Sequence, residues 1–192
     1  MVNVDVRLDD KVLKEAKKAQ ERYGEKFVNR ARRDAAKKAK TALQKEIYQR
    51  YNVKQKEIKD FVSASEKGVC AESRKLTIGT DTHFSITPKG YQSQEGIPVK
   101  KRKRISATII KGQKKRFSHG FILNPVRVKN GAKTMLWGRN GKEPPKPIKS
   151  TSVAEMANQR EIKENTEKVM SETFENRLHH YIEKEMDKIA NH

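Results

Sequence analysis

The sequence predicts an α+β fold, with a long N-terminal amphipathic helix or helix pair, a small antiparallel β-sheet and a long C-terminal helix. Two helical patterns and one strand-like region lead to this prediction. Apolar residues recur at steps of three and four from Asp10 to Tyr51 and again after Ser152, whereas β-branched and aromatic runs alternate with Gly, Pro and Asn from Lys75 to Ile148. These changes of period give the order of the three parts.

The length and composition favour one domain with a modest core. The chain has 192 residues, of which 34% are hydrophobic and 35% are charged. We therefore expect a single α+β domain over residues 1–192, with long helices that bury only one face. Its segments would be a helical arm (1–60), a basic β-rich region (61–150) and a C-terminal helix (151–192).

The N-terminal helical pattern is one apolar stripe that is rich in alanine. Its members are Leu13, Ala16, Ala19, Tyr23, Phe27, Ala31, Ala35, Ala39, Leu43, Ile47 and Tyr51. Gly24 is the expected break, because a glycine inside a helix costs about 1 kcal/mol relative to alanine. The alanines predict that a neighbouring element approaches this stripe closely.

The middle of the chain predicts four to six short antiparallel strands. The clearest strand patterns are Lys75–Gly79, Ile105–Lys111, Phe117–Leu123 and Thr134–Gly138. Asn140-Gly141 has the composition of a turn.

The C-terminal region predicts one long helix. Ser152 can cap it, and Glu155, three residues later, completes a capping-box pattern. The apolar stripe then contains Met156, Ile162, Val169, Met170, Phe174, Leu178, Ile182, Met186 and Ile189. From Ser152 to His192 there are nine acidic residues and six Lys and Arg, so this helix is mildly acidic in a chain of net charge +20.

The excess positive charge is concentrated in one segment. Gly96 to Lys142 contains no Asp or Glu and carries 14 Lys and Arg. The candidate contact residues are Lys100, Lys101, Arg102, Lys103, Arg104, Lys114, Lys115 and Arg116. On facing arms of a hairpin, these two clusters would neutralise phosphates and bind nucleic acid independently of its sequence. Alternatively, they form a solvated loop or contact an acidic partner.

Residues with catalytic or metal-binding chemistry form no pattern in this sequence. His179 and His180 project from different faces of a helix, and Asp81 with His83 lacks a third partner. Cys70 is the only cysteine, so neither an intrachain disulfide nor a cysteine-built zinc site is expected. We predict a protein that is not an enzyme and that uses no metal or cofactor.

The start of the chain has neither the pattern of a secretory signal nor that of a transit peptide, and no apolar run reaches the length of a membrane span. The single cysteine, Cys70, fits a reducing cytoplasm.

Three tracts carry a resemblance to a known family. Residues 44–58 (QKEIYQRYNVKQKEI) end a basic helix with the spacing Tyr-x-Val-x-x-x-x-Ile, residues 136–142 (LWGRNGK) contain Arg-x-Gly-Lys, and residues 147–156 (PIKSTSVAEM) contain Pro-Ile followed by Ser-Val-x-x-Met. In this order they resemble the phage minor tail protein Z family, also called the tail completion proteins. The family-like positions are Ile47, Tyr51, Val53, Ile58, Arg139, Gly141, Pro147, Ile148, Val153 and Met156. Their expected roles are mainly packing and turn formation.

The resemblance implies a structural virion protein of a tailed phage or prophage, which acts in tail completion at the neck. It implies a ring of copies, a hexamer in this family, around the DNA channel. The implied partners are neighbouring tail terminator, tube or connector proteins and the genome, without a membrane, and the host cytoplasm is the expected location during assembly. The alternative is a free nucleic-acid-binding protein without sequence preference, for which the net charge of +20 is sufficient motivation.

Overall fold

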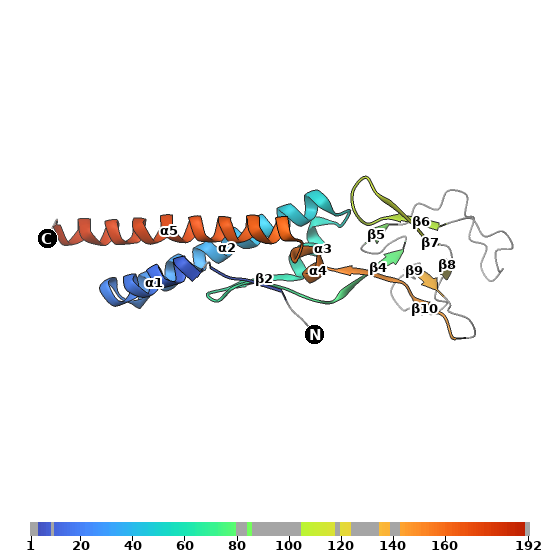
Figure 1. Cartoon of the computed structure of the whole chain (residues 1–192), viewed down its shortest axis with the longest axis horizontal. Helices are drawn as coiled ribbons and strands as arrows, with labels where there is room; N and C mark the ends of the chain where they lie inside the picture. Colours follow the sequence, from blue (N-terminus) through green and yellow to red (C-terminus); the bar gives the residue numbers. More distant parts are fainter. Residues whose placement is uncertain are drawn as a thin grey trace. The chain divides into compact units, whose positions relative to one another are not determined.

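A computed structural model of the chain, shown in Figure 1, describes residues 4–8, 10–79, 84–85, 105–117, 120–123, 135–138 and 143–190. The helices are α1 (Asp10–Tyr23), α2 (Glu25–Arg50), α3 (Gln55–Asp60), α4 (Val153–Ala157) and α5 (Arg160–Ala190). The strands are β1 (Val4–Val6), β2 (Val62–Ser65), β3 (Gly68–Ala71), β4 (Lys75–Gly79), β5 (Phe84–Ser85), β6 (Ile105–Thr108), β7 (Lys114–Phe117), β8 (Gly120–Leu123), β9 (Met135–Gly138), β10 (Lys146–Pro147) and β11 (Lys149–Ser152). The predicted α+β class is confirmed.

Contacts divide the chain into two compact units, which are described separately below. The first unit contains Met1–Ile47, Ile58–Ser73 and Val153–His192, and the second contains Tyr48–Glu57 and Arg74–Ser152. Each unit is therefore assembled from segments that are distant in the sequence.

The N-terminal stripe forms a helix pair that breaks at Gly24, as predicted. Gly24 has a φ of +88°, a left-handed conformation that side chains other than glycine adopt at a cost. In α2, the buried stripe consists of Val28, Ala31, Ala35, Ala36, Ala39, Leu43, Gln44 and Ile47. Small alanines on this face let other elements of the first unit pack close to the helix axis.

Helix α5 has a buried face and contacts α2 through Tyr181. Its buried residues, at helical spacing, are Ile162, Thr166, Met170, Phe174, Leu178 and Tyr181. The Tyr181 hydroxyl donates a hydrogen bond to the Asp34 carboxylate, and the Arg30 guanidinium lies 4.7 Å from the centroid of the Tyr181 ring. The hydrogen bond to Asp34, together with burial, raises the pKa of Tyr181.

Two details of the predicted C-terminal helix were wrong. The helix is not continuous, because α4 ends at Ala157 and α5 begins at Arg160. The break follows from local hydrogen bonding: Gln159 N–H bonds to Met156 C=O, three residues back, which tightens the end of α4. Met186, predicted in the apolar stripe, is 58% exposed.

The first unit also contains a three-stranded antiparallel sheet in the order β1-β3-β2, which the sequence analysis missed. Val62, Val69 and Ala71 are buried in it. Helix α4 is tied to its end, since Ala154 N–H donates to Glu72 C=O over 3.0 Å. Strands of three or four residues are too short to show a clear alternating pattern.

The second unit contains a mixed sheet and a separate hairpin. The sheet has the order β10-β9-β4-β11, with β5 beside β4 and β8 beside β9, while β6 pairs with β7. Leu76, Ile78 and Leu136 are buried in the sheet. The pair β4–β5 is parallel, which corrects the expectation that all strands are antiparallel.

Each of the four predicted strand ranges contains a strand of the structure. Lys75–Gly79 is β4 as predicted, and the predicted strands Ile105–Lys111 and Thr134–Gly138 contain β6 and β9. The predicted strand Phe117–Leu123 contains β8, although Phe117 itself is the last residue of β7. The proposed turn at Asn140-Gly141 lies outside the described residues.

Phe174 tests how much the packing of α5 stabilises the first unit. Its side chain is only 1% exposed, so Phe174→Ala should lower the free energy of unfolding by about 3–5 kcal/mol through lost burial and a residual cavity. Denaturant unfolding followed by helical circular dichroism measures the change. Met186→Ala on the same helix is the control and should change the stability by less than about 0.5 kcal/mol. Equal effects of the two variants would contradict the described packing.

Candidate functional site

The hairpin β6–β7 in the second unit displays part of the basic segment. Its register pairs Ser106 with Arg116, Ala107 with Lys115 and Thr108 with Lys114. The side chains of Lys114, Lys115 and Arg116 are all exposed, whereas Ala107 on the facing strand is buried. The hairpin therefore holds one cluster of the predicted contact residues on a paired strand.

Backbone hydrogen bonds attach this hairpin to the C-terminal end of α2. Lys111 N–H donates to Arg50 C=O, and Asn52 N–H donates to Ile109 C=O, each over 2.9 Å. Between these two bonds, Tyr51 and Ile110 form an antiparallel bridge. The last carbonyl groups of a helix have no partner within the helix, so the hairpin supplies donors that the end of α2 requires. We call this set of contacts the helix–hairpin junction.

Side chains reinforce the helix–hairpin junction. The Lys111 ammonium donates to Tyr48 C=O and lies 4.2 Å from the centroid of the Tyr48 ring. Asn52 Nδ2 donates to Thr108 C=O over 3.2 Å. A cation at the C-terminal end of a helix is also favoured by the helix dipole. Lys111 is thus a structural member of the basic segment as well as a source of positive charge.

Tyr51 is the buried centre of the helix–hairpin junction. Its side chain is 4% exposed and that of Val53 is 3% exposed. Burial raises the pKa of the Tyr51 hydroxyl, although the nearby charge of Arg50 opposes this shift. The junction is therefore a packed contact and not only a set of surface hydrogen bonds.

The turn that joins β6 to β7 depends on a glycine. Gly112 has a φ of +79°, in the left-handed region that favours glycine. Gln113 N–H then donates to Ile110 C=O over 3.0 Å, which closes the turn. The strand β7, which begins with Lys114, Lys115 and Arg116, follows directly after this turn.

Positive charge dominates the hairpin and the helix end to which it is attached. Residues 48–57 and 105–117 contain seven Lys and Arg (Arg50, Lys54, Lys56, Lys111, Lys114, Lys115 and Arg116) and one acidic residue, Glu57. Among the described residues, the cations of β7 have no ion-pair partner, and Lys115 Nζ lies 5.9 Å from the centroid of the Phe117 ring. The three exposed cations of β7 can therefore bind phosphates or the carboxylates of a partner.

The other predicted site residues lie in several places. Lys100–Arg104, Arg139 and Gly141 fall outside the described residues. Six family-like positions are buried, namely Ile47, Tyr51, Val53, Ile58, Val153 and Met156. Pro147 pairs with Trp137 in β10–β9, and Ile148 N–H donates to Leu136 C=O over 2.8 Å.

Sequence reasoning missed the residues that hold the site in place. It did not identify Tyr48, Asn52 or Lys111, because their partners are 56 to 63 residues away along the chain. Only the Tyr51 spacing pointed to this part of the chain, without indicating what Tyr51 contacts.

Within the described part of the chain, no group of three His, Cys, Asp or Glu side chains is placed to hold a metal ion, and none of its helices is long and apolar enough to cross a membrane. The fold and site thus define a basic α+β protein with a cationic hairpin fixed to a helix end. Comparisons with protein-family models, with curated proteins and with solved structures gave no significant match.

The cations of β7 are expected to make a measurable electrostatic contribution to binding of a polyanion. The slope of log K against log salt for duplex DNA changes by about 0.9 for each phosphate contact. Replacement of Lys114, Lys115 and Arg116 by Glu should therefore reduce the slope by about 3, measured by fluorescence anisotropy with a labelled duplex.

The matched control replaces Lys14, Lys17 and Lys18 of α1 by Glu, which changes the net charge equally at exposed positions of the first unit. An equal loss of slope in both variants would show that only the total charge matters and would contradict a role for the hairpin.

Proposed function

We propose that this chain is a structural protein of a tailed phage or prophage particle, which acts in tail completion at the neck and joins the head to the tail. Copies of the chain would form a ring around the DNA channel. The observation that carries this proposal is the helix–hairpin junction, whose hydrogen bonds support a strand with three exposed cations.

The chemistry of the hairpin suits a contact with DNA that passes through a channel. Lysine and arginine side chains on a strand neutralise phosphates whatever the base sequence, and a passing genome has no fixed sequence at the contact. The same cations could pair with carboxylates of an adjacent acidic ring. In either case the contact surface is formed by the exposed basic side chains of β7.

The helices of the first unit offer complementary charges for contacts between copies. Helix α2 contains nine Lys and Arg and three acidic residues, whereas α5 contains six Lys and Arg and eight acidic residues. A closed ring requires each copy to use two different surfaces, one for each neighbour. Opposite net charges on α2 and α5 provide such a pair, and they support assembly in the presence of a net charge of +20.

The second candidate function is a free nucleic-acid-binding protein without sequence preference. The exposed triplet on β7 favours it as well, since phosphate neutralisation alone gives nonspecific binding. This candidate does not require a ring, and it predicts tight binding of duplex by the isolated chain at low salt. The tail protein is expected to bind weakly until it is assembled.

Quantification of the chain in purified particles tests the proposed function. Particles from the source strain would be separated on a density gradient, and mass spectrometry would count this chain against the major tube protein. A few copies per particle are expected, because one ring closes around one axis. Absence from the particles, with the chain sedimenting with ribosomes or nucleoid, would contradict the proposal and support the free nucleic-acid-binding protein.

A further inference from the structure

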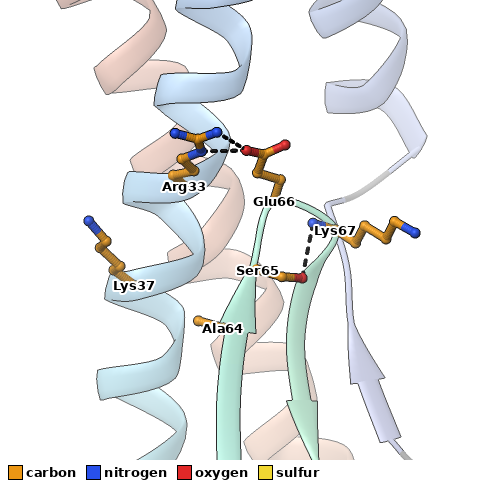
Figure 2. A pocket seen from close by; sticks show the side chains of 6 residues that line it. All are labelled: Arg33, Lys37, Ala64, Ser65, Glu66 and Lys67. Atoms are coloured by element: carbon orange, nitrogen blue, oxygen red, sulfur yellow. Dashed lines mark hydrogen bonds and ion pairs between the residues drawn. The ribbon is translucent and has the colours of Figure 1, made fainter.

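An open groove lies between α2 and the β2–β3 hairpin in the first unit (Figure 2). Its volume is about 650 Å³, and its lining residues are Arg33 and Lys37 from α2 and Ala64, Ser65, Glu66 and Lys67 from β2 and the following turn. Figure 2 shows Ala64 on the side of β2 that is near α2. The groove therefore lies along β2 as well as along the side chains of α2.

β2 is an edge strand of its sheet, and among the described residues no strand pairs with its outer side. In the order β1-β3-β2 it has only β3 as a partner, with Val62 opposite Ala71 and Ala64 opposite Val69. Glu72 N–H donates to Phe61 C=O, so Phe61 belongs to a hydrogen-bonded pair. Such pairs alternate along an antiparallel ladder, which makes Ser63 and Ser65 bonded positions. The N–H and C=O groups of Val62 and Ala64 therefore point toward the open edge.

Charge at the groove is arranged around one ion pair. The Arg33 guanidinium binds the Glu66 carboxylate at the turn end of the groove. Lys37 lies one helical turn further along α2, is exposed, and has no ion pair among the described residues. The walls of the groove thus carry more positive than negative charge beside a free strand edge.

We propose that this groove binds an extended acidic segment of a partner protein. The segment pairs with β2 as an additional strand, through hydrogen bonds to Ala64, and places a carboxylate beside Lys37 and Arg33. Strand addition at an exposed edge is a general mode of peptide recognition, in which the main chain supplies affinity and nearby side chains supply selectivity. A net charge of +20 favours an acidic partner over a second copy of this chain. The inference does not depend on the proposed function.

Binding of a defined peptide by the full-length chain tests the strand addition. The probe is a fluorescein-labelled octapeptide of alternating valine and glutamate, and anisotropy measures its dissociation constant. Main-chain recognition predicts saturable binding below about 1 mM, and a peptide of alternating valine and lysine should bind at least tenfold more weakly. The same acidic peptide with an N-methyl group on every residue should lose binding, since neither of its two edges can then pair with β2.

Ala64→Pro separates strand addition from simple charge attraction. Proline removes the outward N–H, but is tolerated on an edge strand where that group does not bond within the sheet. It should weaken binding of the acidic peptide at least tenfold, whereas Ala64→Val, which keeps the N–H, should bind like the wild type. Circular dichroism of both variants verifies that the sheet and helices are retained.

Two charge variants test the positions of Lys37 and Glu66. Lys37→Glu should weaken binding several-fold, and Lys45→Glu, an equal charge change at another exposed position of α2, should not. Glu66→Gln releases Arg33 from its ion pair and should strengthen binding. Normal binding by Ala64→Pro would overturn the proposal, as would no binding of the acidic peptide at about 1 mM. Self-association that this peptide reverses would instead assign the groove to a second copy and overturn the choice of an acidic partner.

Discussion

The end of α2 sets the constraint on which the basic site depends. A helix that stops at Arg50 leaves carbonyl groups without internal partners, and Lys111 satisfies two of them, through its N–H to Arg50 and its ammonium to Tyr48. The next residue, Tyr51, forms an antiparallel β-bridge with Ile110. Because the helix end and the hairpin turn complete each other's hydrogen bonding, the adjoining β7 cations are held next to residues 48–52.

The helices and several strands could be predicted from the sequence because their signals are local. The buried stripe of α2 repeats from Val28 to Ile47, and the glycine at residue 24 marks the break between α1 and α2. The triplet Lys114–Arg116 could be identified as part of a basic site from its charge alone. The support of that site could not, since the contacts of Lys111 with Tyr48 and of Asn52 with Thr108 join segments far apart in the chain. The short sheet β1-β3-β2 was missed for the related reason that pairing, not periodicity, defines it.

The two surfaces described here share a physical principle. The hairpin β6–β7 offers charge, and the edge of β2 offers backbone hydrogen bonds beside charge. Neither surface requires a particular base sequence or a deep specificity pocket. Such recognition suits a protein whose partners are repeated or extended, as the components of an assembled particle are. The buried family-like residues Tyr51 and Val53 contribute by fixing the support and need not touch a partner themselves.

We propose that the hairpin β6–β7 faces a polyanion in an assembled particle. Electron cryomicroscopy of the neck of purified particles would test it most directly, by locating β7 relative to the DNA and the adjacent proteins. We expect density that places Lys114, Lys115 and Arg116 against the DNA channel or against an acidic neighbouring protein. A map with these residues on the outer surface, in contact with neither, would contradict the account.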